Sequence, residues 1–129
     1  MFHHILIPTD LSDRATQAVD MARDLGQPAG ARLTLLHVIE TISGAGFDEF
    51  RSFYRELEGR AFEFLATLAS RSDGSGLEVA RTVVYGKPAE EIVRFAADKQ
   101  VDLIVLASHQ VDLSQPGHGW GTLSYKVGV

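Results

Sequence analysis

The chain has 129 residues, a net charge of −5 at pH 7 and no cysteine. This length is typical of one domain with a real hydrophobic core, and contents of 45% hydrophobic and 22% charged residues are ordinary for a soluble globular protein. The acidic balance and the lack of a Lys/Arg-rich run argue against a nucleic-acid surface, which needs clustered cations. Without cysteine, disulfides and thiolate metal sites are excluded.

The first eight residues lack the basic and then apolar pattern of a secretion signal. No apolar run approaches the roughly 20 residues that span a bilayer. We therefore expect a cytoplasmic protein without a membrane partner, folded as a single domain over residues 1–129.

The N-terminal third predicts a strand, a helix and a second strand. Residues 2–8 are an apolar run stopped by Pro8, and Ser12 or Asp13 can cap the helix that follows. Gly26 suits the C-terminus of this helix, and residues 33–38 form the next apolar strand. The inward face of the helix is predicted from residues at helical spacing: Ala15, Ala18, Val19, Ala22 and Leu25.

A long helix is predicted beyond the glycine-containing loop at residues 43–48. Its apolar stripe is better explained by contact with a sheet than by a cofactor groove. Glu56 and Arg60, four residues apart in the favourable order, belong to its solvated side. The stripe consists of Phe50, Phe53, Tyr54, Leu57, Ala61, Phe64, Leu65 and Leu68.

Two further strands are predicted with different positions in the sheet. Residues 77–84 alternate between apolar and polar, which is typical of an edge strand. Residues 102–107 are predicted as a central strand covered on both faces, because residues 103–107 are uniformly apolar. Between them, Pro88 opens a helix. Its predicted inward residues are Ala89, Ile92, Val93 and Ala96.

Alternating strands and helices predict a doubly wound α/β sandwich with a parallel sheet. A last helix is expected after Gly121, but the sequence ends at Val129 with no fifth strand. Either the chain is truncated, or something outside it covers that edge of the sheet. Ligands of such folds bind at the carboxyl ends of the strands, here near Asp10, Val38 and Ser108.

Four segments in order along nearly the whole chain give it a specific resemblance. They are residues 5–12 (ILIPTDLS), 36–38 (LHV), 86–89 (GKPA) and 102–109 (DLIVLASH). In these segments the chain resembles the universal stress protein family. The resemblance implies a Rossmann-like fold of the adenine nucleotide alpha-hydrolase type, a homodimer and a role in the stress response.

The resemblance also implies an ATP or AMP site, with Mg²⁺ only as a companion of the nucleotide. Asp10 would lie near the ribose, Val38 at the adenine, and a glycine-rich loop around the phosphates. The full set of binding residues implied is Pro8, Thr9, Asp10, Val38, Ala107, Ser108, His109, Gln110, Gly121 and Thr122.

The phosphate loop departs from the family pattern, which is glycine, two residues, glycine, nine residues, then glycine with serine or threonine. Here Ala107 and Gln110 replace the first two glycines, and ten residues precede Gly121 and Thr122. A side chain at Gln110 occupies a place where glycine would let an amide face a phosphate. Gly121 and Thr122 still suit a helix N-terminus that attracts an anion.

Simpler explanations compete at several positions. Asp10 can cap the first helix instead of contacting ribose, Val38 is core under either function, and His37 is best explained as a hydrogen-bonded strand residue. His3 and His4 point to opposite faces of a strand, so they do not share a metal.

No catalytic residue is predicted. The side chains of Ser108 and His109 diverge as neighbours on an extended segment, and no P-loop lysine motif is present. Three functions remain, in this order: a nucleotide-binding regulatory module, a family member that acts by homodimerisation or partner contact without nucleotide, and a slow ATP hydrolase.

Overall fold

The computed structural model describes residues 1–41 and 47–107. Its strands are β1 (His4–Pro8), β2 (Arg32–Ile39), β3 (Val79–Tyr85) and β4 (Leu103–Ile104). Its helices are α1 (Ala15–Gly26), α2 (Arg51–Ser70) and α3 (Pro88–Asp98), with short 3-10 turns at Gln27–Ala29 and Phe47–Phe50. The strands form one sheet in the order β3-β2-β1-β4.

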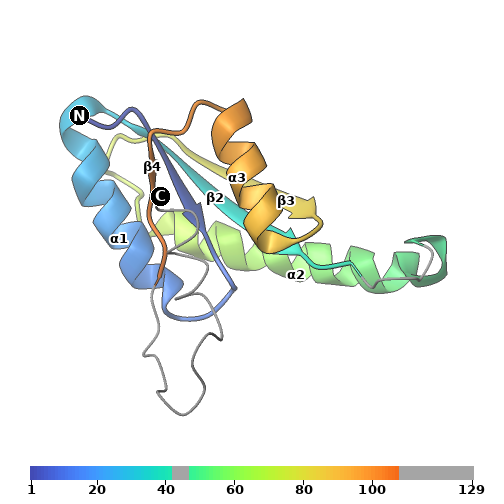
Figure 1. Ribbon diagram of the computed structural model, residues 1–129. Coiled ribbons are helices and arrows are strands. Elements are labelled where there is room, and N and C mark those ends of the chain that lie inside the picture. The colour runs from blue at the N-terminus through green and yellow to red at the C-terminus, as the bar shows by residue number, and fades with distance from the viewer. Residues whose placement is uncertain (42–46, 108–129) are drawn as a thin grey trace, which may run out of the picture.

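Helices cover the sheet on two faces, α1 and α2 on one and α3 on the other (Figure 1). All strand pairs are parallel, which confirms the predicted doubly wound α/β sandwich. The chain runs outward from β1 through β2 to β3 and then returns to place β4 on the other side of β1. The winding therefore reverses at β1, and ligands of open α/β sheets bind at such a reversal.

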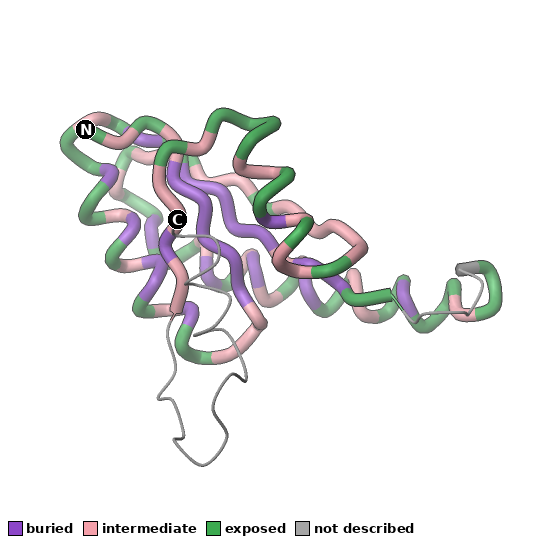
Figure 2. Tube along the Cα trace, viewed as in Figure 1, coloured by how far each residue is buried: buried purple, intermediate pink, exposed green. Residues whose placement is uncertain are grey.

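The pleat of the strands divides the core into two clusters. Ile5 and Ile7 of β1 face α1 and α2, whereas Leu6 between them faces α3 and packs with Leu36 and Ile92. Figure 2 shows this buried interior running along the middle strands. Since β1 and β2 are buried on both faces, they need the nearly continuous apolar sequence that predicted them.

The predictions for the two outer strands had different outcomes. β3 pairs only with β2 in the described sheet, so its edge position is confirmed. The prediction of a central strand at residues 102–107 is wrong for the described residues, because β4 spans only Leu103–Ile104 and pairs only with β1. Leu103 packs on one core cluster and Ile104 on the other, so the apolar run reflects contacts on both faces and not neighbours on both edges. The predicted helix after Gly121 and the missing fifth strand lie outside the described residues.

The start of α1 differs from the prediction. Arg14 occupies the position before the helix, and no side chain caps it. Instead, the backbone oxygens of Ser12 and Asp13 accept hydrogen bonds from the amides of Ala15 and Thr16, at 3.1 and 3.2 Å. The predicted side-chain cap at Ser12 or Asp13 is therefore wrong, because a tight turn supplies backbone acceptors. The helix ends at Gly26 as predicted, but Leu25 is exposed.

Helix α3 begins at Pro88 as predicted and buries Ile92 fully. Val93 was predicted to face inward but is 52% exposed, because the sheet lies against only a narrow side of this helix. Gly86 before the helix has φ +145°, and a Cβ atom there would lie 2.8 Å from the Glu91 side chain. Glycine is needed here for its conformation, whereas the flexible side chain of Glu91 can move away from a Cβ atom.

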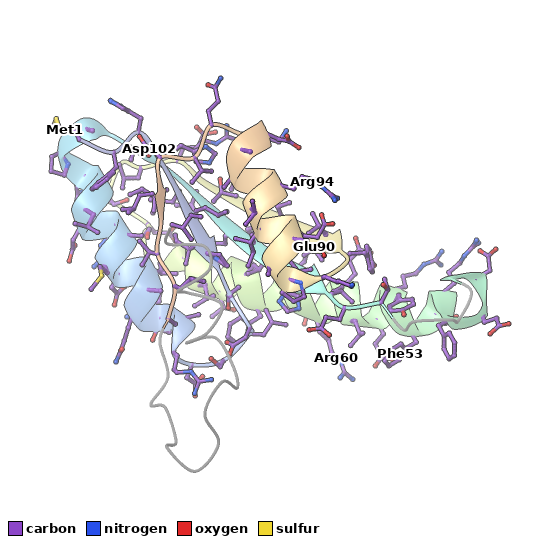
Figure 3. All side chains as sticks on the ribbon, viewed as in Figure 1. Met1, Phe53, Arg60, Glu90, Arg94 and Asp102 are labelled. Atoms are coloured by element: carbon purple, nitrogen blue, oxygen red, sulfur yellow. The ribbon has the colours of Figure 1, made fainter. Side chains whose placement is uncertain are left out.

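Helix α2 covers the sheet with only part of its length. Tyr54 is buried and packs edge-on against Tyr85 of β3, with ring centroids 5.8 Å apart, and Leu65 lies in the core. The N-terminal end of the helix extends beyond the strands, as Figure 1 shows. Phe53, labelled in Figure 3, lies there and is 49% exposed, so its predicted inward position is wrong. The predicted ion pair between Glu56 and Arg60 is present at 2.7 Å.

Asp102 holds the amino end of β1 against the segment that leads into β4 (Figure 3). Its two carboxylate oxygens accept hydrogen bonds from the amides of His3 and His4, at 2.8 and 3.0 Å. Burial acts to raise the pKa of Asp102, but these hydrogen bonds outweigh it and hold the pKa below its ordinary value. The ionised carboxylate therefore stabilises the folded state.

Replacing Asp102 with asparagine is expected to lower the free energy of unfolding by about 1 kcal/mol at pH 7, after allowance for solvent screening. Because the folded-state pKa is depressed, the stabilisation is present above the unfolded value near 3.8 and is lost as pH falls through the folded one. Urea unfolding of both proteins should thus show a difference that shrinks below that pH. Asp73→Asn, at an exposed turn position, is the control. A difference that stayed constant down to pH 3 would contradict this role.

Candidate functional site

The carboxyl end of β1 is fixed to β2 by two hydrogen bonds at Thr9. Its amide donates to the oxygen of Leu36, and its own oxygen accepts from Nδ1 of His37, both at 2.8 Å. Because a carbonyl oxygen only accepts, this ring nitrogen carries the proton. The prediction of a hydrogen-bonded strand residue at His37 is confirmed. Pro8 and Thr9 are both buried, so the backbone that leads to Asp10 is held in place.

A tight turn follows, built by side chains that hydrogen-bond to the backbone. Thr9 Oγ1 accepts from the amide of Leu11, and Asp10 Oδ1 accepts from the amide of Ser12, both at 3.0 Å. Between them Leu11 has φ +64°, a conformation that costs a residue with a side chain some free energy. The two hydrogen bonds offset this strain, and the apolar side chain of Leu11 packs against the core.

Asp10 is ionised at neutral pH. Partial burial acts to raise its pKa, but hydrogen bonds from Ser12 and Arg14 and the charge of Arg14 outweigh this effect and lower the pKa. Arg14 donates to Oδ2 at 3.3 Å, and the carboxylate is 24% exposed. It bonds to the turn before α1 and does not cap the helix. Lone pairs remain on both oxygens, so this carboxylate can accept hydrogen bonds from hydroxyl groups of a ligand.

The other described site residues lie at the same end of the sheet. Val38 lies two residues beyond Leu36 in β2. Its side chain is buried with Leu6 and Ile92 as part of the core. The amide of Val105 donates to the oxygen of Leu6 at 2.9 Å, so the chain beyond β4 continues alongside β1 toward Ala107. Ala107 and Leu11 pack against the same core cluster. The structure thus brings the ends of β1 and β2 and the segment after β4 together at one edge.

Two residues of this region were not predicted as part of the site. Arg14 pairs with Asp10, and the spacing of four residues between opposite charges is a signal that could have identified it. His37 positions Thr9 across the strand boundary, and no sequence pattern indicates such a contact.

The predicted phosphate residues Ser108, His109, Gln110, Gly121 and Thr122 lie outside the described residues. Within residues 1–41 and 47–107, no three His, Asp or Glu side chains gather in a way that could hold a metal ion. In the same part of the chain, no helix is long and apolar enough to cross a membrane.

Comparison with known proteins places this geometry in context. Residues 1–118 match the family model described as the universal stress protein family. The chain is 29% identical to universal stress protein YxiE of Bacillus subtilis over 124 residues, which cover 86% of this chain and 82% of that protein.

Solved structures share the fold. The structure of MJ0577, a universal stress protein of Methanocaldococcus jannaschii, is 28% identical with a TM-score of 0.81, covering 98% of this chain and 88% of that one. A universal stress protein family protein of Arabidopsis thaliana, solved with AMP bound, is 16% identical with a TM-score of 0.64 and coverages of 96% and 82%. At that identity the second likeness shows the fold alone.

Proposed function

Since the chain belongs to the universal stress protein family, we propose that it is a regulatory module that binds an adenine nucleotide at the carboxyl ends of β1 and β4. The observation that carries the proposal is the ionised Asp10, held at the point where the winding of the sheet reverses. A solved structure of the same fold, the universal stress protein family protein of Arabidopsis thaliana, holds AMP, and this is the ligand class that we choose.

In the proposed complex, Asp10 accepts hydrogen bonds from the ribose hydroxyls. A carboxylate at the carboxyl end of a strand is a common ribose contact in nucleotide-binding α/β folds. The turn at Thr9 to Ser12 fixes the direction of this carboxylate before the ligand arrives, which lowers the entropy lost on binding. The adenine lies toward Val38, and the phosphates lie toward Gly121 and Thr122.

Titration of the purified protein with AMP, ADP and ATP tests the proposal by calorimetry. We expect AMP and ADP to bind within about tenfold of ATP, or roughly 1.4 kcal/mol, because Gln110 and the lengthened spacer weaken recognition of the longer phosphate chains. GTP is the control for recognition of the base. ATP binding a hundredfold tighter than AMP would contradict this interpretation of Gln110.

A second candidate function is action through a homodimer or a protein partner, without nucleotide. The altered phosphate loop favours it, since the side chain of Gln110 replaces a glycine. This second function becomes the preferred one if no adenine nucleotide binds at millimolar concentration. Light scattering at micromolar protein concentration then separates dimer from monomer.

A further inference from the structure

A polar cavity lies at the opposite end of the sheet from Asp10. It has a volume of 340 Å³ and is bounded by the sheet and the last turn of α3, which runs back toward the amino ends of the strands (Figure 1). His4 and Arg32 are the first residues of β1 and β2, and they lie opposite each other in the sheet register. The cavity is lined by His4, Arg32, Thr34, Ala80, Thr82, Phe95 and Lys99.

The lining of this cavity is positively charged, although the chain as a whole carries a net charge of −5. Arg32 and Lys99 are exposed, and neither forms an ion pair with another described residue. Among the described residues that line the cavity, none is acidic. The hydroxyl of Thr82 likewise has no hydrogen-bond partner among residues 1–41 and 47–107. The side chains of Arg32, Lys99 and Thr82 are therefore three possible hydrogen-bond donors along the wall of this cavity.

His4 makes the floor of the cavity rigid. Its Nδ1 lies 3.0 Å from the oxygen of Lys99, and its Nε2 lies 2.8 Å from Oγ1 of Thr34. Because the carbonyl oxygen only accepts, Nδ1 carries the proton, and in the neutral ring Nε2 accepts from the threonine hydroxyl. This ring therefore joins the end of α3 to the sheet. Its N–H also satisfies the Lys99 carbonyl at the negative end of the helix, which reduces the repulsion that this end exerts on an anion. These two hydrogen bonds do not involve the side chain of Arg32.

We propose that this cavity is a binding site for a phosphate monoester that carries a small apolar group. Two cations match the charge of a phosphate monoester, which approaches −2 at neutral pH, and the fork of an arginine suits its oxygens. Phe95 and Ala80 supply an apolar wall for the organic group. The volume lies within the usual range for small-molecule sites and exceeds what inorganic phosphate fills.

The test uses the full-length ¹⁵N-labelled protein and phenyl phosphate, followed by NMR. We expect the amide chemical shifts of residues around Arg32, Thr82 and Lys99 to change when phenyl phosphate is added. Inorganic phosphate alone and phenol alone should bind more weakly than phenyl phosphate. Arg32→Gln and Lys99→Gln should each weaken phenyl phosphate about tenfold, the loss of one charge-assisted hydrogen bond. Arg81→Gln is the matched control, because it removes the same charge from the other face of the sheet, outside this cavity.

Three results would overturn the site. Shifts confined to Thr9, Asp10 and Ser12 would assign phenyl phosphate to the proposed nucleotide site. An unchanged affinity for phenyl phosphate in Arg32→Gln would show that the guanidinium of Arg32 does not contact the ligand. An equal loss of affinity in Arg81→Gln would show that phenyl phosphate is attracted only by the overall charge of the surface. The thermal midpoints of all variants confirm folding. AMP binding should be unchanged in Arg32→Gln, so this inference and the proposed function succeed or fail separately.

Discussion

Replacement of Asp10 by asparagine is expected to weaken the binding of AMP, ADP and ATP by the same factor, about tenfold or more. The variant keeps an oxygen that can accept from the amide of Ser12, so the turn survives. It loses the negative charge and one acceptor for the ribose, a charge-assisted interaction worth about 1.5 to 3 kcal/mol. The loss is equal for the three ligands because they share the ribose and differ only in phosphates. Calorimetric titration measures it.

Asp13→Asn is the matched control for this experiment. It removes the same charge from the same loop, but Asp13 is exposed and its side chain makes no described contact with Asp10. Its nucleotide affinity should equal that of the unaltered protein. A loss confined to ATP in Asp10→Asn would contradict a ribose contact and place the carboxylate near the phosphates instead. Equal losses of nucleotide affinity in both variants would mean that only the net charge of the loop matters and that Asp10 does not contact the ribose.

Truncation of Leu65 to alanine should lower the free energy of unfolding by about 2 to 5 kcal/mol, the range for fully buried leucines. Leu65 is 0% exposed and belongs to the cluster between α1, α2 and the sheet. Removing its methyl groups leaves a cavity that the surrounding side chains fill only in part, because protein interiors are close-packed. Urea unfolding followed by circular dichroism gives the value.

Phe53→Ala on the same helix tests the same stripe where it leaves the sheet. We expect the free energy of unfolding to fall by about 1 kcal/mol or less, because half of the Phe53 side chain is already in contact with water. This loss is smaller than that of Leu65→Ala even though phenylalanine is the larger side chain. Its described ring contact is with the adjacent Tyr54, at a centroid distance of 5.7 Å. Equal losses in the two variants would mean that the end of α2 is covered in solution by something outside the described residues.

The helical spacing of apolar residues identifies which side of a helix is buried. It does not tell how far along the helix, or how widely around it, the sheet covers that side. The stripe of α2 identified Leu65 and Tyr54 as core correctly, and it included Phe53 by the same rule. The difference arises because the helix is longer than the sheet it covers. Val93 of α3 and Leu25 of α1 were placed wrongly for a similar reason, since each lies at the margin of a face that meets the sheet over a narrow strip.

The sequence by itself determined the parallel α/β architecture, because buried parallel strands require apolar runs and crossover helices require amphipathic ones. It also located Asp10 just beyond the first strand, since Pro8 stops the first apolar run. Ala107, expected at the end of the last strand, instead lies beyond the end of β4 at Ile104. Only the tertiary structure decided the neighbours of β4, the absence of a side-chain cap on α1, and the contact of His37 with Thr9. It alone brought Arg32 and Lys99 to one cavity. The cap of α1 was settled by backbone acceptors within the turn itself. The other features depend on residues far apart in the chain, and their meeting is set by register and packing that no local pattern encodes.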